Sequence, residues 1–107
     1  MGMRLEASVI VEQLAAEAIR SCADTLHMEY SAGSEEVFAL KGGVGVLIAK
    51  YSSSSPEAAS LRAELHALAG RKRCISVGGS EYELRGSAHE SFGETAFRVE
   101  LRCARRP

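Results

Sequence analysis

The 107-residue sequence contains no tryptophan, two prolines and few aromatic residues. A core without large aromatic anchors has to be built from leucine, valine, isoleucine and alanine. Apolar residues nevertheless make up 46% of the chain and charged residues 25%, which are ordinary values for a globular protein and argue against a disordered chain. Because the length lies near the commonest domain size, we expect residues 1–107 to form a single domain.

Long apolar runs and an excess of one charge are also missing. The longest uncharged stretch, residues 42–49, is far shorter than the roughly 20 residues that a spanning helix needs. The N-terminus lacks the apolar segment and small-residue cleavage site of a signal peptide. Thirteen Lys and Arg balance 14 Asp and Glu, so the molecule offers no long-range attraction to nucleic acid or to an anionic membrane. These absences predict a cytoplasmic protein without a membrane partner.

Cysteine and histidine are few and widely spaced. Cys22, Cys74 and Cys103 form an odd set without a C-x-x-C spacing, which argues against a disulfide framework or a zinc knuckle. We expect reduced thiols, with Cys22 and Cys74 buried and Cys103 the most exposed. The histidines form no H-x-x-x-H pair, so no metal site is predicted. They are His27, His66 and His89.

Residues 5–28 predict a long first helix, because they lack Gly and Pro and are rich in Ala, Leu, Glu and Gln. The apolar residues recur at helical spacing. They are Val11, Leu14, Ala15, Ala18, Cys22 and Leu26. The β-branched run at residues 9–11 also suits an initial strand, so the pattern leaves open whether residues 5–11 begin as strand or helix.

A β-hairpin is expected next. Gly42 and Gly43 can both take the positive φ that a two-residue type I′ turn requires. The first strand is expected to begin at Val37, and the returning strand is expected to end at Tyr51. Both faces of residues 44–49 are apolar or Gly. This pattern predicts a central strand that is covered on both sides.

The second helix has the clearest boundaries in the sequence. Ser55 suits the N-cap, Pro56 the first helical position and Glu57 the positive end, and Gly70 can terminate the helix. The buried stripe is expected to consist of Leu61, Leu65 and Leu68.

Three strands are predicted after this helix. Residues 74–77 and 80–88 flank a Gly78–Gly79 turn, and apolar and charged residues alternate along the last strand, from Phe97 to Cys103. One register of the last hairpin places apolar residues opposite one another inside and Glu opposite Arg outside. Its pairs are Leu84 with Leu101, Tyr82 with Cys103, Arg85 with Glu100 and Glu83 with Arg102.

These elements predict an α+β fold: a single two-layer domain with the order helix, strand, strand, helix, strand, strand, strand. The sheet is expected to be mostly antiparallel with five strands. This order is similar to the core order of the Roadblock/LC7 dynein-light-chain-like domains. The resemblance implies a non-catalytic adaptor that dimerises, and it rests on element order without a diagnostic motif or the family's final helix.

No motif predicts a catalytic centre, a cofactor or a metal. The sequence KGGVG at residues 41–45 is followed by a strand, whereas phosphate-binding loops open a helix. The carboxylate pairs Glu35–Glu36 and Glu81–Glu83 are explained by solvated strand faces. The motifs therefore give no support for an enzyme and favour a non-enzymatic protein.

A basic cluster is the one candidate binding site. Its residues could meet if the third and fifth predicted strands end together. They are Arg71, Lys72, Arg73, Arg102, Arg105 and Arg106. Charged residues that flank apolar strands also protect against aggregation, so nucleic-acid binding is the less favoured explanation.

The leading functional hypothesis is a non-enzymatic interaction or adaptor module that binds a protein partner or forms a homodimer. It follows from the apolar hairpin, the amphipathic first helix and an edge strand, all of which need to be covered. One alternative is a small-ligand or nucleic-acid binding domain that uses the Arg-rich end of the sheet. The other is a small enzyme whose His or Glu side chains meet in a pocket.

Overall fold

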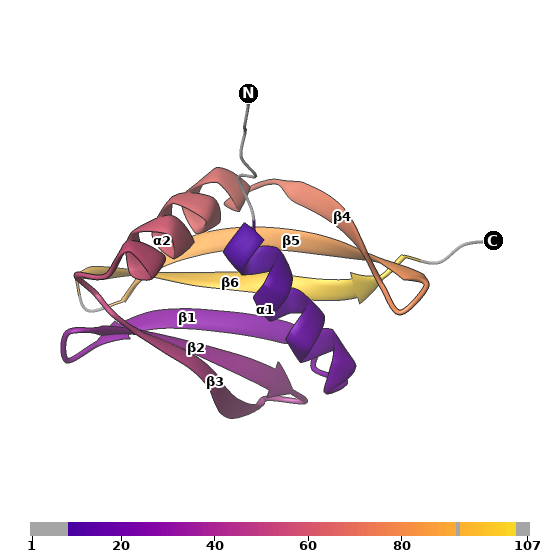
Figure 1. Cartoon of the computed structure of the whole chain (residues 1–107), viewed down its shortest axis with the longest axis horizontal. Helices are drawn as coiled ribbons and strands as arrows, with labels where there is room; N and C mark the ends of the chain where they lie inside the picture. Colours follow the sequence, from indigo (N-terminus) through magenta and orange to yellow (C-terminus); the bar gives the residue numbers. More distant parts are fainter. Residues whose placement is uncertain (1–8, 92, 105–107) are drawn as a thin grey trace.

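A six-stranded antiparallel sheet carries two helices on one face in the computed structural model (Figure 1), which describes residues 9–91 and 93–104. The chain runs through α1 (Val9–Arg20), β1 (Thr25–Ser31), β2 (Ser34–Lys41), β3 (Val44–Ser52), α2 (Pro56–Leu68), β4 (Lys72–Val77), β5 (Ser80–Ser91) and β6 (Glu94–Cys103). The strand order across the sheet is β3-β2-β1-β6-β5-β4. Each half of the chain is thus one helix followed by three antiparallel strands, and the halves join where β1 pairs with β6.

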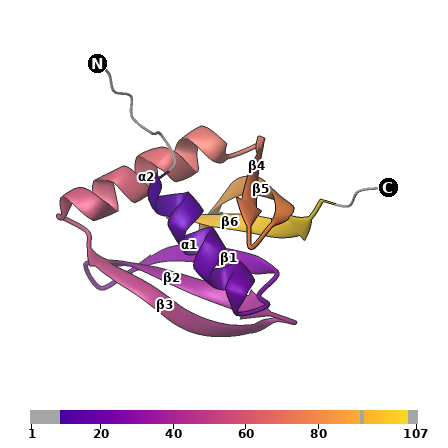
Figure 2. The same cartoon turned by 45° about the vertical axis from the view of Figure 1, so that its right-hand side comes forward.

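The core lies between the helices and the sheet, and the turned view in Figure 2 shows both helices on the same side. No described element covers the other face. The buried apolar residues come from both helices and from the central strands. They are Val11, Leu14, Ala15, Ala18, Leu26, Met28, Val37, Ala39, Leu61, Leu65, Leu68, Leu84, Phe97, Val99 and Leu101.

The sequence-based prediction of one helix over residues 5–28 is wrong at its C-terminal end. Residues 9–11 are helical, but α1 ends at Arg20 and the chain turns into β1. The turn is a Schellman motif: Ala23 donates its N–H to the Ala18 carbonyl, and Cys22, at φ 66°, donates to the Ile19 carbonyl. Leu26 lies in β1, and its helical spacing from the apolar residues of α1 is a coincidence. The sheet therefore has six strands and not five, and the observed order differs from the one behind the Roadblock/LC7 resemblance.

Three hairpin turns whose residues are all described share one backbone geometry. Both turn residues have positive φ at Ala32–Gly33, Gly42–Gly43 and Gly78–Gly79, as type I′ turns require. This confirms the two predicted Gly–Gly hairpins. The predicted register between β5 and β6 is also confirmed, because all four expected pairs are present.

The predicted central position of residues 44–49 is wrong, because β3 is an edge strand. The apolar composition of residues 44–49 predicted that both faces of this strand are buried. In the structure Val44 is 70% exposed and Val46 62% exposed. A bulge at Ile48, where Val37 pairs with Ala49 and Phe38 with Leu47, leaves residues 44–47 as a regular stretch of edge.

Both ends of α2 match the prediction. The Ser55 side chain accepts a hydrogen bond from the Ala58 N–H at 3.1 Å, and Pro56 occupies the first turn. Gly70 takes φ 75° just beyond the helix, and its N–H donates to the Gly86 carbonyl. This bond brings β5 against the end of α2. A Cβ atom on Gly86 would lie 2.8 Å from the Leu68 carbonyl oxygen, so only glycine fits.

The N-terminus of α1 is held by a residue of α2. Glu64, nearly buried, accepts hydrogen bonds from the N–H groups of Val11 at 2.8 Å and Ile10 at 3.3 Å. The carboxylate thus caps the positive end of α1 from 53 residues away. Burial nevertheless raises the pKa of Glu64, and the two backbone hydrogen bonds oppose that rise.

Candidate functional site

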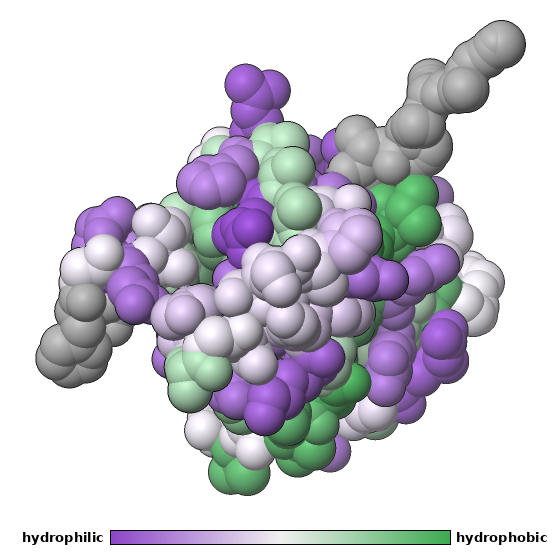
Figure 3. Space-filling model, turned by 60° about the vertical axis from the view of Figure 1, so that its left-hand side comes forward, coloured by the Kyte–Doolittle hydropathy of each residue, from purple (hydrophilic) through white to green (hydrophobic). Residues whose placement is uncertain are grey.

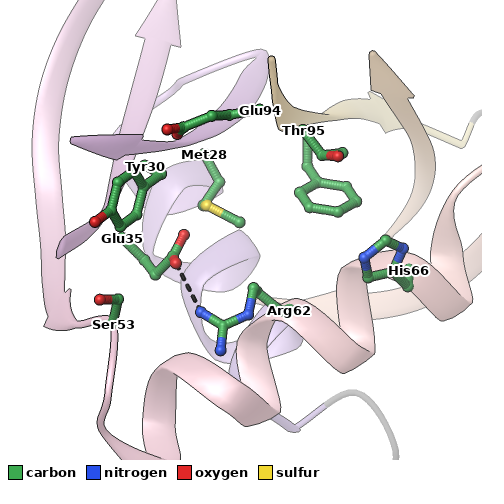
Figure 4. A pocket seen from close by; sticks show the side chains of 9 residues that line it. Met28, Tyr30, Glu35, Ser53, Arg62, His66, Glu94 and Thr95 are labelled. Atoms are coloured by element: carbon green, nitrogen blue, oxygen red, sulfur yellow. Dashed lines mark hydrogen bonds and ion pairs between the residues drawn. The ribbon is translucent and has the colours of Figure 1, made fainter. Parts of the chain in front are cut away.

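A cavity of about 560 Å³ opens between α2 and one end of the sheet (Figure 4). Its lining comes from β1, β2 and β6, from the loop before α2, and from α2 itself. The residues are Met28, Tyr30, Glu35, Ser53, Arg62, His66, Glu94, Thr95 and Phe97.

An ion pair between Glu35 and Arg62 forms one wall of the cavity. Along β2, Glu35 shares its face with Val37 and Ala39, so strand alternation points it at the helices and leaves it 4% exposed. The Arg62 guanidinium donates from Nη1 to Oε2 of Glu35 at 2.6 Å. A carboxylate this buried requires such a partner, because an unpaired buried charge is costly.

The remaining walls combine aromatic and polar groups. Arg62 and His66 are four residues apart on α2 and therefore lie on the same side of the helix. The His66 and Phe97 rings pack in a T-shaped arrangement, with centroids 4.9 Å apart and planes at 83°. Glu94 and Thr95 begin β6 on the side of the cavity opposite α2 (Figure 4).

The sequence did not single out this cavity. The Glu35–Glu36 pair predicted two solvated carboxylates, which is wrong for Glu35, whereas Glu36 lies on the opposite face of the sheet and pairs with Lys50 at 3.9 Å. The alternation of Glu35 with Val37 and Ala39 could have indicated its burial. The approach of Arg62 from α2 depends on tertiary packing, which no local pattern specifies.

The structure separates the residues of the predicted basic cluster. Arg73 lies on the helix side of β4 and contacts Glu12 of α1 at 3.5 Å. Lys72 lies on the other face and contacts Glu83 at 3.5 Å. Arg102 pairs in register with the same Glu83 on the neighbouring strand. The last two residues of the predicted cluster, Arg105 and Arg106, lie outside the described residues.

Two residues of the cluster meet at a second depression, of about 390 Å³. Arg71 and Lys72 line it together with Arg85 of β5, and Glu100 of β6 places a carboxylate in the same lining. Glu83 approaches Arg85 at 3.8 Å and also pairs with Lys72. Acidic side chains therefore neutralise part of the positive charge at this end of the sheet.

The histidines and cysteines are dispersed. His27 and His89 approach one another on the open face of the sheet, with ring centroids 6.1 Å apart. Burial lowers the pKa of His27, and the nearby Arg98 and His89 lower it further against the opposing effect of Glu29. Within residues 9–91 and 93–104, no three His, Cys, Asp or Glu side chains gather as metal ligands would.

All three cysteines are free and exposed, contrary to the predicted burial of Cys22 and Cys74. Cys22 lies beyond the end of α1, and Cys74 lies on the edge strand β4. Neither side chain therefore contributes to the core.

The two edges of the sheet differ in chemistry. Along β3, Val44, Val46 and Leu47 are 70%, 62% and 47% exposed. Hydrophobic residues also gather at the lower edge of the surface in Figure 3, where β3 runs in Figure 1. At the opposite edge, β4 begins with the exposed Lys72 and Arg73. The β3 edge is thus the larger apolar surface that the described elements leave uncovered.

No protein-family model matches the chain, and no curated protein gives a significant match. None of the described helices is both long and apolar enough to cross a membrane. Function is therefore inferred from the cavity and from the two edges of the sheet.

Proposed function

We propose that the protein is a non-enzymatic interaction module that forms a homodimer by pairing the β3 edges of two copies. The observation that carries this proposal is the exposure of Val44, Val46 and Leu47 on an edge strand. The cytoplasmic location expected from the sequence belongs to the same proposal.

An uncovered edge strand presents unpaired backbone N–H and C=O groups, and proteins usually protect such edges with charged residues or proline. The β4 edge has this protection in Lys72 and Arg73. Residues 44–47 contain neither charge nor proline. The β3 edge therefore has the composition of a strand that pairs.

A second copy suits this edge because antiparallel pairing is self-complementary. A two-fold axis through Val46 sets the Val46 residues of two copies opposite each other and Gly45 opposite Leu47. The nearest charges, Lys41 and Lys50, lie beyond the paired stretch. The pairing uses the apolar edge of both copies and leaves only the charged β4 edges at the outside of the joined sheet.

The test compares one charge placed on each edge. Val46→Lys puts a cation at the centre of the proposed pairing, and Ser76→Lys puts the same charge on the exposed surface of β4. Sedimentation velocity over a wide concentration range should find dimers for the wild type and for Ser76→Lys, and monomers for Val46→Lys. Circular dichroism should show the same secondary structure in all three proteins.

A wild-type protein that stays monomeric over the whole range would refute the proposal. A Val46→Lys variant that dimerises like the wild type would refute the assignment to β3.

A further inference from the structure

The cavity between α2 and the sheet brings cationic and anionic side chains together, and the dimer does not explain this arrangement. Arg62 and His66 approach from α2, whereas Glu35 and Glu94 approach from β2 and β6 (Figure 4). One side can therefore donate to an anionic group while the other accepts from a cationic group.

Glu35 retains hydrogen-bonding capacity toward this space. Its Oε2 accepts from Arg62, and no described residue donates a hydrogen bond to Oε1. No side-chain oxygen or nitrogen of the described residues is both fully buried and unpartnered, so Oε1 is reachable by solvent. A nearly buried carboxylate with one open oxygen can accept from a ligand N–H and form a charge-assisted hydrogen bond.

Arg62 has similar capacity. A guanidinium carries five N–H donors, and one nitrogen of Arg62 contacts Glu35. The Arg62 side chain is 39% exposed, which leaves other donors accessible. Glu35 holds the guanidinium in place and so lowers the entropy lost when Arg62 binds an anion.

The short distance between these two groups restricts the ligand. Arg62 and Glu35 meet at 2.6 Å, so any ligand at the pair faces a cation and an anion side by side. A simple amine would be attracted by Glu35 and repelled by Arg62, and a simple carboxylate would experience the reverse. An α-amino acid carries its ammonium and carboxylate on one carbon, which matches both neighbours at once.

The rest of the cavity suits an apolar side chain. Tyr30, 41% exposed, presents an aromatic ring to the cavity beside the charged groups, and the buried Met28 and Phe97 form an apolar floor beneath it. The volume of about 560 Å³ lies within the range of small-molecule sites. We infer that the cavity binds a zwitterionic α-amino acid with an apolar or aromatic side chain.

The test uses three probes with the same phenyl group: L-phenylalanine with both charges, phenethylamine with the ammonium alone, and 3-phenylpropionate with the carboxylate alone. Titrations of the 107-residue chain, followed by amide NMR shifts and by calorimetry, measure each affinity. L-phenylalanine should bind about 10-fold or more tightly than either single-charge probe, since each charge-assisted hydrogen bond contributes roughly that factor. The shifted amides should include Glu35, Arg62 and Thr95.

Substitutions identify the side chains that bind each charged group of the ligand. Glu94→Gln, at an exposed position, should weaken L-phenylalanine and phenethylamine several-fold while leaving 3-phenylpropionate unchanged. The double variant Glu35→Gln with Arg62→Gln removes the ion pair without leaving a buried charge, and it should abolish the preference for L-phenylalanine. Glu100→Gln and Arg98→Gln, on the opposite face of the sheet, are the matched controls and should leave all three affinities unchanged.

Equal binding of phenethylamine and L-phenylalanine would overturn the inference, because it would show a site for simple cations. So would the absence of shifts at the cavity with all three probes at their solubility limits. Residues 44–47 lie at the opposite end of β3 from Ser53 of the cavity, so Val46→Lys should leave these affinities unchanged. A failed dimer and a failed ligand site are therefore distinguishable.

Discussion

The two halves of the chain repeat the same order of elements, but they secure their helices by different means. In residues 55–103, Ser55 caps α2 from within the same half, and Gly70 ends the helix. In residues 9–52, the N-terminus of α1 is capped by Glu64 of the other half, and Cys22 occupies the left-handed position at its C-terminal end. The second half thus uses local devices, whereas the first depends on a contact across the molecule.

The strands differ in the same way. Gly86 of β5 lies directly beneath the end of α2, and the two segments exchange backbone hydrogen bonds. Gly45 of β3 lies on the open edge, where a Cβ atom would meet only side-chain atoms of Leu40 and Phe38 at 3.7 Å or more. The second half therefore joins its helix tightly to its strands, whereas the first half leaves its outer strand free for association.

Replacing Gly86 by alanine should have the largest effect on stability. The added methyl would meet the Leu68 carbonyl oxygen at 2.8 Å, and that backbone cannot move without shifting the end of α2. Overpacking of this kind costs about 3 kcal/mol, at the upper end of the usual range. Thermal unfolding followed by circular dichroism should show a midpoint lower by about 12 °C.

Gly45→Ala is the matched control in the first half. Its Cβ atom would make ordinary van der Waals contacts, so stability should be unchanged or higher by up to about 0.5 kcal/mol. Equal losses in the two variants would contradict the proposed difference between the halves.

Removing the caps should give intermediate effects. Glu64→Ala leaves the Val11 and Ile10 N–H groups without their carboxylate, and hydrogen bonds to a charged group contribute about 2 kcal/mol. Ser55→Ala removes a neutral cap and should cost about 1 kcal/mol. Urea unfolding of both variants measures the loss of stability in each. A larger loss for Ser55→Ala than for Glu64→Ala would contradict the expected order.

The pH dependence of Glu64 gives a second measurement of the same cap. Burial raises the pKa of Glu64 above its ordinary value of 4.5, so the folded protein binds the proton more tightly than the unfolded chain. The resulting stabilisation is fully present below pH 4.5 and is lost as the pH rises through the folded pKa. The stability of the wild type relative to Glu64→Gln should therefore increase as the pH falls from 7 toward 4, and a constant difference would contradict the raised pKa.

The smallest expected effects concern the C-terminal ends of the helices. Cys22 takes φ 66°, which is costly for a residue with a Cβ atom, so Cys22→Gly should stabilise the protein by about 0.5–1 kcal/mol. Gly70→Ala, the matched change after α2, should destabilise it by about 1 kcal/mol. Urea unfolding at one pH measures both changes in stability. If Gly70→Ala stabilised the protein, the C-terminal ends of α1 and α2 would not be equivalent.

The features of the fold that could be predicted from the sequence depend on short-range chemistry. The boundaries of α2 follow from Ser55, Pro56 and Gly70, the two Gly–Gly turns from the need for positive φ, and the β5–β6 register from the alternation of Glu and Arg opposite one another. Each of these features is specified by neighbouring residues or by one hairpin, so a local pattern is sufficient to predict it.

Tertiary structure decided the remaining features. The end of α1 is set by a Schellman turn without glycine, and the strand that follows continued the apolar spacing of the helix. The edge position of β3 depends on which strands pair, and the ion pair of Glu35 with Arg62 joins residues 27 positions apart. Only the packing of α2 against the sheet brings such residues together, and for this reason the candidate cavity could not be predicted from sequence patterns.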